Sequence, residues 1–238
     1  RLLHQPSGAV MLTLVLLPRT TGAPTRGERL SWRRFGAEHL ASYRDPRALL
    51  PGAIFVWHTL MYTSLVTFIP LFGGPADVGM LLIWMPLLSI VGTLAAGLAI
   101  RVLPRPALVA ATGFLLVAAL TLALWWAISG MRDIVALALV LMVFSGLIQG
   151  AAFSLIPALS TDPAVNARAN GTITQLGNLG NLLGSPLFAA ALAASTVGTL
   201  GEFGAMALLV VALCVAGIAC CALTQRWMRR HDAPLPHP

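Results

Sequence analysis

Six long runs without Asp, Glu, Lys or Arg take up most of this chain, and they decide what it can fold into. Each run is long enough for the roughly 20 residues that a helix needs to cross the hydrocarbon core of a bilayer. In hydrocarbon every backbone N–H and C=O must find a partner inside the segment, and the runs are too long and too uniformly apolar for barrel strands. We therefore predict an all-α, polytopic membrane protein whose spans are 51–72, 78–100, 106–128, 134–157, 170–195 and 203–225.

The arginines predict how these spans are oriented. The chain of 238 residues is 58% hydrophobic, and its net charge of +7 comes from 15 arginines, with no lysine, against 8 acids. In a nucleic-acid-binding protein basic residues cluster on one face, whereas these arginines lie in the connections between apolar runs. Thirteen of them fall on one side of the predicted membrane. Because positive residues are retained in the cytoplasm, we expect the tail 226–238 to be cytoplasmic.

The same composition bears on location and partners. A chain this apolar is expected to have the lipid bilayer as its surroundings, with no nucleic-acid partner. The use of arginine alone and the many alanines indicate a GC-rich genome. We therefore expect a cell membrane, and a bacterial inner membrane in particular.

The first fifty residues differ from the rest. A shorter apolar run ends at Leu17, and residues 1–17 are interpreted as the end of a truncated transmembrane helix. Residues 18–50 are predicted to form a central cytoplasmic loop. Apolar and aromatic residues in this loop recur at roughly helical spacing beside several arginines, which indicates an amphipathic helix on the inner leaflet. A solvated basic linker remains the alternative. The residues concerned are Trp32, Phe35, His39, Leu40 and Tyr43.

Polar side chains inside the spans are candidates for contact with a solute, since such groups are costly in lipid. His58 and Tyr62 are four residues apart and share one face of their helix, and the same holds for Ser145 and Gln149. The candidates for lining a cavity are His58, Tyr62, Ser145, Gln149, Gln175 and Asn178. For each of them, a plain role in helix packing or interface anchoring stays open.

Glycines in the same spans predict close helix packing, because a helix surface without side chains lets a neighbour approach. The glycines expected to pack are Gly146, Gly150, Gly177, Gly180 and Gly184. Span 170–195 is the richest in both glycine and amide side chains, so we expect it to lie inside the bundle. Spans 106–128 and 203–225 nearly lack strong hydrogen-bonding groups and are expected to face lipid.

No group of residues in the sequence has the pattern of a catalytic or metal site. The five histidines are scattered, and Cys214, Cys220 and Cys221 share one apolar run, where they are expected to pack. A phosphate-binding Gly-Lys-Ser/Thr loop is absent from the sequence. We therefore predict no catalytic residue, no metal and no cofactor, and we do not expect an enzyme.

The order of these features resembles the C-terminal half of the major facilitator superfamily, from the end of the sixth helix through the twelfth. The resemblance covers essentially the whole chain as a six-helix repeat plus a partial preceding helix. It is most specific in a stretch similar to the tenth and eleventh helices of many such transporters: Gly146, Gly150, Pro157, Asp162, Gly171, Gln175, Gly180, Gly184 and Pro186. The resemblance implies that spans 51–72 and 134–157 line a central cavity and that 170–195 borders it.

The resemblance also implies a function: gradient-driven transport of a small solute by alternating access. Its partners would be the missing N-terminal six-helix half, the solute, and H⁺ as a candidate coupling ion. The family's loop motif is only half present, because Ile100 stands where an acid is expected. Arg101 and Arg105 therefore keep their cytoplasmic placement but cannot make the local ion pair. A non-transporting truncated remnant and, with less support, a membrane-embedded enzyme remain the alternatives.

Overall fold

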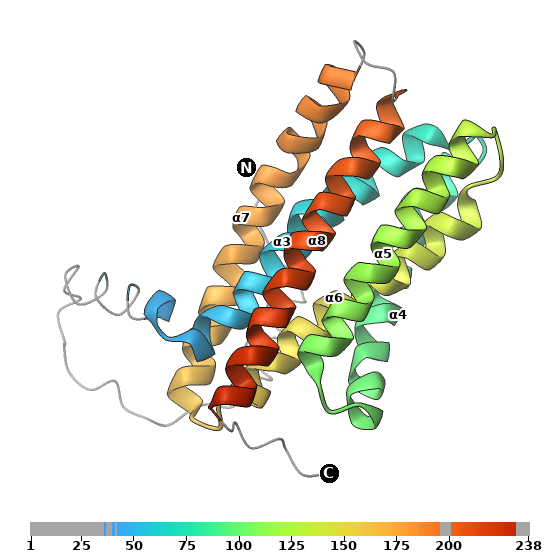
Figure 1. Ribbon diagram of the computed structural model, residues 1–238. Coiled ribbons are helices and arrows are strands. Elements are labelled where there is room, and N and C mark those ends of the chain that lie inside the picture. Colours follow the sequence, from blue (N-terminus) through green and yellow to red (C-terminus); the bar gives the residue numbers. More distant parts are fainter. Residues whose placement is uncertain (1–35, 37–39, 41, 196–200, 232–238) are drawn as a thin grey trace, which may run out of the picture. The chain divides into compact units, whose positions relative to one another are not determined.

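The computed structural model describes residues 36, 40, 42–195 and 201–231 (Figure 1). Six of its helices are long and apolar enough to cross a membrane, and the described residues include no strand. The elements are α3 (Pro46–Phe68), the 3-10 turn η1 (Ile69–Phe72), α4 (Val78–Val102), α5 (Pro106–Ser129), α6 (Val135–Leu159), α7 (Pro163–Ser195) and α8 (Gly201–Arg230). The chain is a multi-pass α-helical membrane protein, which confirms the predicted fold class. The expectations for 1–17 and for most of 18–50 lie outside the described residues.

Helices α3 and α7 begin with the same local arrangement, an Asp followed by a proline at the first helical position. The Asp45 side chain accepts a hydrogen bond from the backbone N–H of Arg47 at 3.0 Å, and Asp162 accepts one from Ala164 at 2.9 Å. Each carboxylate satisfies an N–H that the helix itself leaves unpaired. Both helices therefore begin several residues before the charge-free runs, and α7 includes the charged Arg168 in its early turns.

The helices that pack most closely are far apart in sequence. Helix α3 lies along α7, and α4 lies along α6, each pair running in parallel. Helix α5 packs on α6 and α8, and α3 also contacts α6 and α8. If α3 is matched with α6, α4 with α7 and α5 with α8, the α3–α7 contact corresponds to the α6–α4 contact. Because α3 and α6 run in opposite directions, the two triplets form an inverted repeat in their pattern of contacts.

The α4–α6 crossing depends on glycine. Gly146 lies directly against the carbonyl of Ser89, and a Cβ on Gly150 would be 2.6 Å from the Cβ of Ala96. At this crossing Thr93 donates a hydrogen bond to the carbonyl of Gly146 at 3.2 Å. The backbones are therefore in contact at this point, with no room for a side chain between them.

The α3–α7 crossing is built in the same way. A Cβ on Gly177 would be 2.6 Å from the Phe55 ring, and one on Gly180 would be 2.9 Å from the carbonyl oxygen of Val56. Gly184 lies against the backbone of Leu60. The glycine face of α7 is thus covered by α3.

The opposite face of α7 is not covered, so the expectation that span 170–195 lies inside the bundle is wrong for this chain. In the most apolar 18-residue stretch of α7, only 22% of the residues are buried. The value for α4 is the same, and that for α5 is 44%. The expectation that 106–128 and 203–225 face lipid is met only in part, since α5 and α8 pack on each other. Helix α4 carries the broadest exposed apolar face: Leu82, Ile83, Trp84, Leu87, Ile90, Val91, Leu94 and Leu98.

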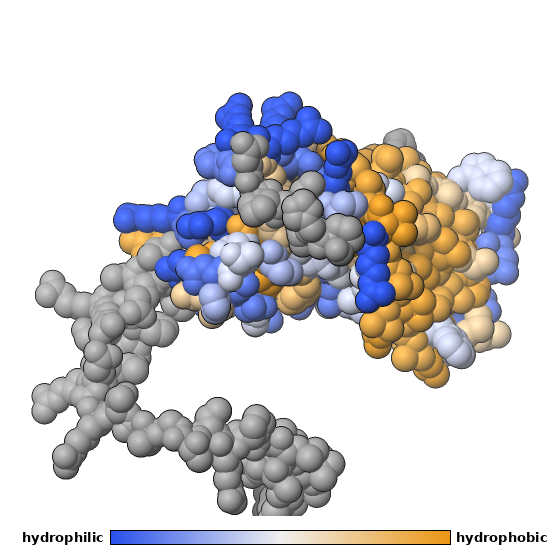
Figure 2. Space-filling view, turned by 90° about the horizontal axis from the view of Figure 1, so that it is seen from below, coloured by the Kyte–Doolittle hydropathy of each residue, from blue (hydrophilic) through white to orange (hydrophobic). Residues whose placement is uncertain are grey.

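Hydrophilic residues gather at the ends of the helices. Seen from the end where α3, α5 and α7 begin, the surface shows hydrophilic groups beside a broad hydrophobic flank (Figure 2). We call this the arginine-rich end, since it holds Arg47, Arg101, Arg105, Arg168, Arg226, Arg229 and Arg230. At the opposite end, Arg132 stacks on the Trp126 ring at 3.6 Å.

Candidate functional site

Two of the predicted cavity residues meet halfway along the helices. The imidazole Nε2 of His58 on α3 lies 3.0 Å from the hydroxyl oxygen of Ser145 on α6. His58 is 12 residues from the start of α3 and Ser145 is 14 residues from the end of α6. At 1.5 Å per residue these positions are about 18 and 21 Å from the arginine-rich end, near the middle of a membrane. Both side chains are buried, with 1% and 0% of their surface exposed.

The second nitrogen of this imidazole is buried without a partner in the described structure. Nδ1 of His58 is buried and makes no hydrogen bond among the described residues. The ring lies between Phe55, with centroids 5.6 Å apart, and Tyr62, at 5.4 Å. An unsatisfied buried polar atom costs about 1–3 kcal/mol, so this position is expensive to maintain for packing alone.

Among the described residues, Oδ1 of Asn166 near the start of α7 is the other buried side-chain atom without a partner, while the buried threonines of the spans avoid this cost. The hydroxyls of Thr59, Thr121, Thr172 and Thr224 each donate to a backbone carbonyl one turn earlier in the same helix. A hydroxyl can make such a bond locally, whereas an imidazole is too large to do so. His58 therefore needs a partner from another helix, and Ser145 supplies only one.

The structure places Tyr62 beside His58, while Gln149 lies one turn beyond Ser145 on α6 and is partly exposed. Gln175 and Asn178 are separate from this group, on the exposed face of α7. The structure thus brings together three of the six predicted residues and leaves the others along neighbouring surfaces.

The exposed face of α7 makes two polar contacts, one with α3 and one with the segment just before α3. The Tyr43 hydroxyl donates to Oε1 of Gln175 at 2.6 Å, and the Thr63 hydroxyl donates to Oδ1 of Asn181 at 2.8 Å. Asn178 lies between these contacts and is exposed. Asn181 was not singled out from the sequence. Its position near Asn178 on the helical surface was the available signal, since residues three apart lie on neighbouring parts of a helix face.

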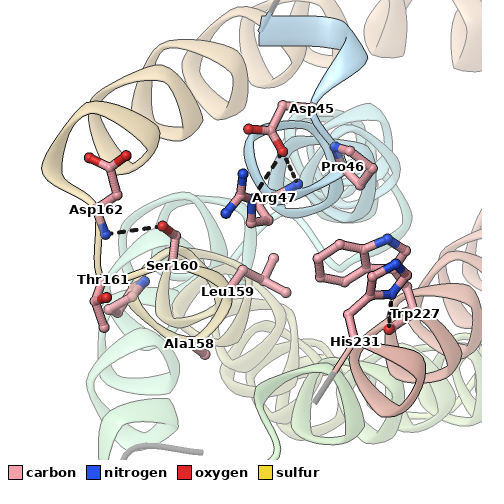
Figure 3. Close-up of a pocket in the computed structure, with 11 residues that line it drawn as sticks. Asp45, Pro46, Arg47, Ala158, Leu159, Ser160, Thr161, Asp162, Trp227 and His231 are labelled. Atoms are coloured by element: carbon pink, nitrogen blue, oxygen red, sulfur yellow. Dashed lines mark hydrogen bonds and ion pairs between the residues drawn. The ribbon is translucent and has the colours of Figure 1, made fainter. Parts of the chain in front are cut away.

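A cavity of about 590 Å³ opens at the arginine-rich end, between the start of α3 and the ends of α6 and α8 (Figure 3). Asp45 is held there by Arg47 at 3.3 Å and Arg168 at 3.6 Å. The far wall is the stacked pair of Trp227 and His231, with centroids 4.5 Å apart. Its lining includes none of the mid-membrane candidates, so this cavity is a feature of the helix ends.

The remaining predictions concern charge and metal binding. Arg101 and Arg105 are exposed, and neither has an acidic partner within ion-pair distance in the described part of the chain. The described residues contain no cluster of His, Cys, Asp or Glu able to hold a metal ion. The predicted packing glycines all lie at helix contacts. Gly146 and Gly150 of α6 contact α4, and the three glycines of α7 contact α3.

The polar groups within the spans fall into two sets. One is the buried His58–Ser145 contact between α3 and α6, and the other is the exposed amide face of α7. Imidazole, hydroxyl and amide groups can hydrogen-bond a polar solute, and the imidazole can also bind a proton, but none of them offers a fixed charge. Comparison of the chain with protein-family models, curated proteins and solved structures finds no match.

Proposed function

We propose that this chain is one six-helix half of a secondary transporter, which moves a small solute across a membrane by alternating access. The observation that carries the proposal is the uncovered polar face of α7. Thr174, Gln175, Asn178 and Asn181 are exposed there, in the central part of a helix long enough to span the bilayer. The Thr174 hydroxyl is bonded within α7, but lipid tails cannot hydrogen-bond exposed amides such as that of Asn178, so the face requires water or a second polar protein surface.

The arrangement of the helices supports the same proposal. Many transporters are built from inverted repeats, with the solute site near the middle of the membrane at the contact between the repeats. In this chain α3 and α6 occupy equivalent places in the two triplets, and their contact is where His58 meets Ser145. A partner bundle placed over the α7 face would enclose a polar path beside this contact.

The chemistry of these surfaces favours a small, uncharged or weakly charged solute. Amides and hydroxyls predominate, and the six charge-free runs contain no Lys or Arg to balance several negative charges. A polyanion would lose its hydration there without compensation. H⁺ is the candidate coupling ion, and the bacterial inner membrane is the proposed location, with the arginine-rich end in the cytoplasm.

The test is uptake by vesicles that hold the full reading frame encoding this chain, assayed with a panel of small neutral solutes. We expect Asn178→Ala to reduce uptake strongly and Leu87→Ala to leave it close to the parent. These positions are matched, since each is exposed and lies 15 residues from the arginine-rich end of its helix, α7 or α4. Normal insertion without uptake of any solute in the parent would favour the non-transporting alternative.

A second experiment tests whether the α7 face is wet. In a variant without Cys214, Cys220 and Cys221, a cysteine is introduced in place of Asn178 or Leu87. A charged thiol reagent that cannot enter lipid should label Asn178→Cys, and the panel solute should protect it. Leu87→Cys should stay unlabelled. Equal labelling at both positions would contradict an aqueous path along α7.

A further inference from the structure

His58 differs from every other side chain within the six spans. None of the charge-free runs contains Asp, Glu, Lys or Arg, and His58 is the one histidine among them. It is buried at mid-membrane depth with one nitrogen on Ser145 and the other unpartnered. Replacing it by an apolar residue would fill the same space without leaving a buried nitrogen unsatisfied.

In the described part of the chain, the groups that face this imidazole are neutral. On α3 itself the only titratable neighbour is Tyr62, at 5.4 Å. Helix α6 presents Ser145, and α7 presents its glycine face to α3. Helix α8 approaches the same part of α3 through Cys214, whose sulfur lies 3.7 Å from that of Met61. An imidazolium enclosed in this way would have neither water nor a counter-charge, so a proton can bind only when the surroundings open.

We propose that His58 is the proton-binding residue of this half, with Nδ1 as the atom that takes up the proton and Ser145 as the residue that positions the ring. The inference rests on the proposed transport function and names its coupling site. When the α3–α6 contact opens to water on one side, neutral His58 binds one H⁺. When the contact opens on the other side, the same H⁺ leaves and the neutral ring returns to Ser145.

The closed arrangement supplies the tight seal that such a cycle needs. With the ring held between Phe55 and Tyr62 and bonded to Ser145, Nδ1 has almost no surface accessible to bulk solvent. Proton binding is therefore linked to separation of α3 from α6. A solute that favours the separated state would also favour proton uptake, which is the coupling that a symporter or antiporter requires.

The test compares the parent with His58→Gln in vesicles that hold the full reading frame. A glutamine can still hydrogen-bond Ser145 but cannot bind a proton near neutral pH. For a panel solute that the parent accumulates, we expect His58→Gln to lose accumulation driven by a pH gradient while retaining solute exchange in the absence of a gradient. Ser145→Ala, which keeps the imidazole, should retain gradient-driven accumulation with an altered pH profile.

A spectroscopic measurement separates this inference from the transport proposal. With the panel solute present to favour the separated state, the ¹⁵N signals of His58 in the full-length protein, assigned by their loss in His58→Gln, should show reversible protonation between about pH 5 and 8. Signals that stay in one neutral form over that range would overturn the role of His58 even if the parent transports. Accumulation by His58→Gln equal to the parent would do the same. Absence of any uptake in the parent would instead refute the transport proposal.

Discussion

A single methyl group at the α4–α6 crossing should measurably weaken the fold. In Gly146→Ala the new Cβ would lie 2.7 Å from the carbonyl carbon of Ser89 and 2.9 Å from the amide nitrogen of Thr93. Ordinary contact begins near 3.4 Å and the Ser89 carbonyl oxygen would be closer still, so the helices must separate by about 1 Å or more, a gap that removes about half of each nearby contact energy. With on the order of 20 atom pairs of about 0.1–0.2 kcal/mol each, the loss is about 1–2 kcal/mol.

The separation also weakens a hydrogen bond. The Thr93 hydroxyl donates to the Gly146 carbonyl at 3.2 Å, and it retains its second acceptor, the Ser89 carbonyl at 3.0 Å, after the shift. We therefore expect a total destabilisation of about 1–3 kcal/mol, within the usual range for overpacking. For a chain of this length each kcal/mol lowers the unfolding midpoint by about 2–4 °C.

The assay is thermal unfolding of the purified chain in detergent, with Gly97→Ala as the matched control. Gly97 is also in the interior of a helix of this crossing, but a Cβ there meets no atom within 4 Å. Because alanine favours helix over glycine by about 1 kcal/mol at most, the control should be neutral or slightly stabilised. If Gly146→Ala unfolds at the same temperature as Gly97→Ala, the backbone contact inferred for α4 and α6 is absent.

Three further substitutions test other contacts, with the free energy of unfolding as the measurement. Gly217→Ala should destabilise the α5–α8 contact by about 1–3 kcal/mol, because its Cβ would lie 2.5 Å from the Phe114 ring; an unchanged midpoint would show that this ring moves aside freely. Tyr43→Phe removes the exposed bond to Gln175 and should cost about 0.5–1 kcal/mol, and a loss above about 2 kcal/mol would mean that water does not compete for this bond. Thr121→Val should change stability by less than about 1 kcal/mol, since its hydroxyl bonds only within α5; a larger loss would reveal a partner on another helix.

The sequence predicted the number and type of the helices well, because length and lack of charge are properties of each segment alone. All six predicted spans correspond to helices of the structure. The boundaries were less accurate where a helix continues past a charged residue. Helix α7 includes Arg168, and α8 continues through Arg226 to Arg230, since charged side chains at a helix end can reach the polar interface.

Relations between helices could not be predicted with the same success. His58 and Ser145 were each singled out, but their contact depends on the depth at which α3 crosses α6, which neither segment encodes alone. The apolar composition of α5 and α8 indicated lipid exposure, yet apolar side chains pack equally well on lipid tails and on other helices. The glycines were more informative, since all five that were expected to pack lie at helix contacts, although other helical glycines such as Gly97 and Gly171 meet no neighbour.

The uncovered amide face of α7 has a consequence for how the chain is made. Comparing the most apolar 18-residue stretch of each of the six helices, that of α7 is the least hydrophobic and that of α8, which follows it, is the most. A nascent segment enters the bilayer from the insertion machinery according to its apolar content, so α7 alone has little drive to leave the aqueous channel. The glycine surface of α7 packs against α3, which is synthesised about a hundred residues earlier and is then already in the membrane. We therefore expect membrane insertion of α7 to depend on its packing against α3. If synthesis stops before Gly201, the chain lacks α8, and α7 is not anchored by the helix that follows it.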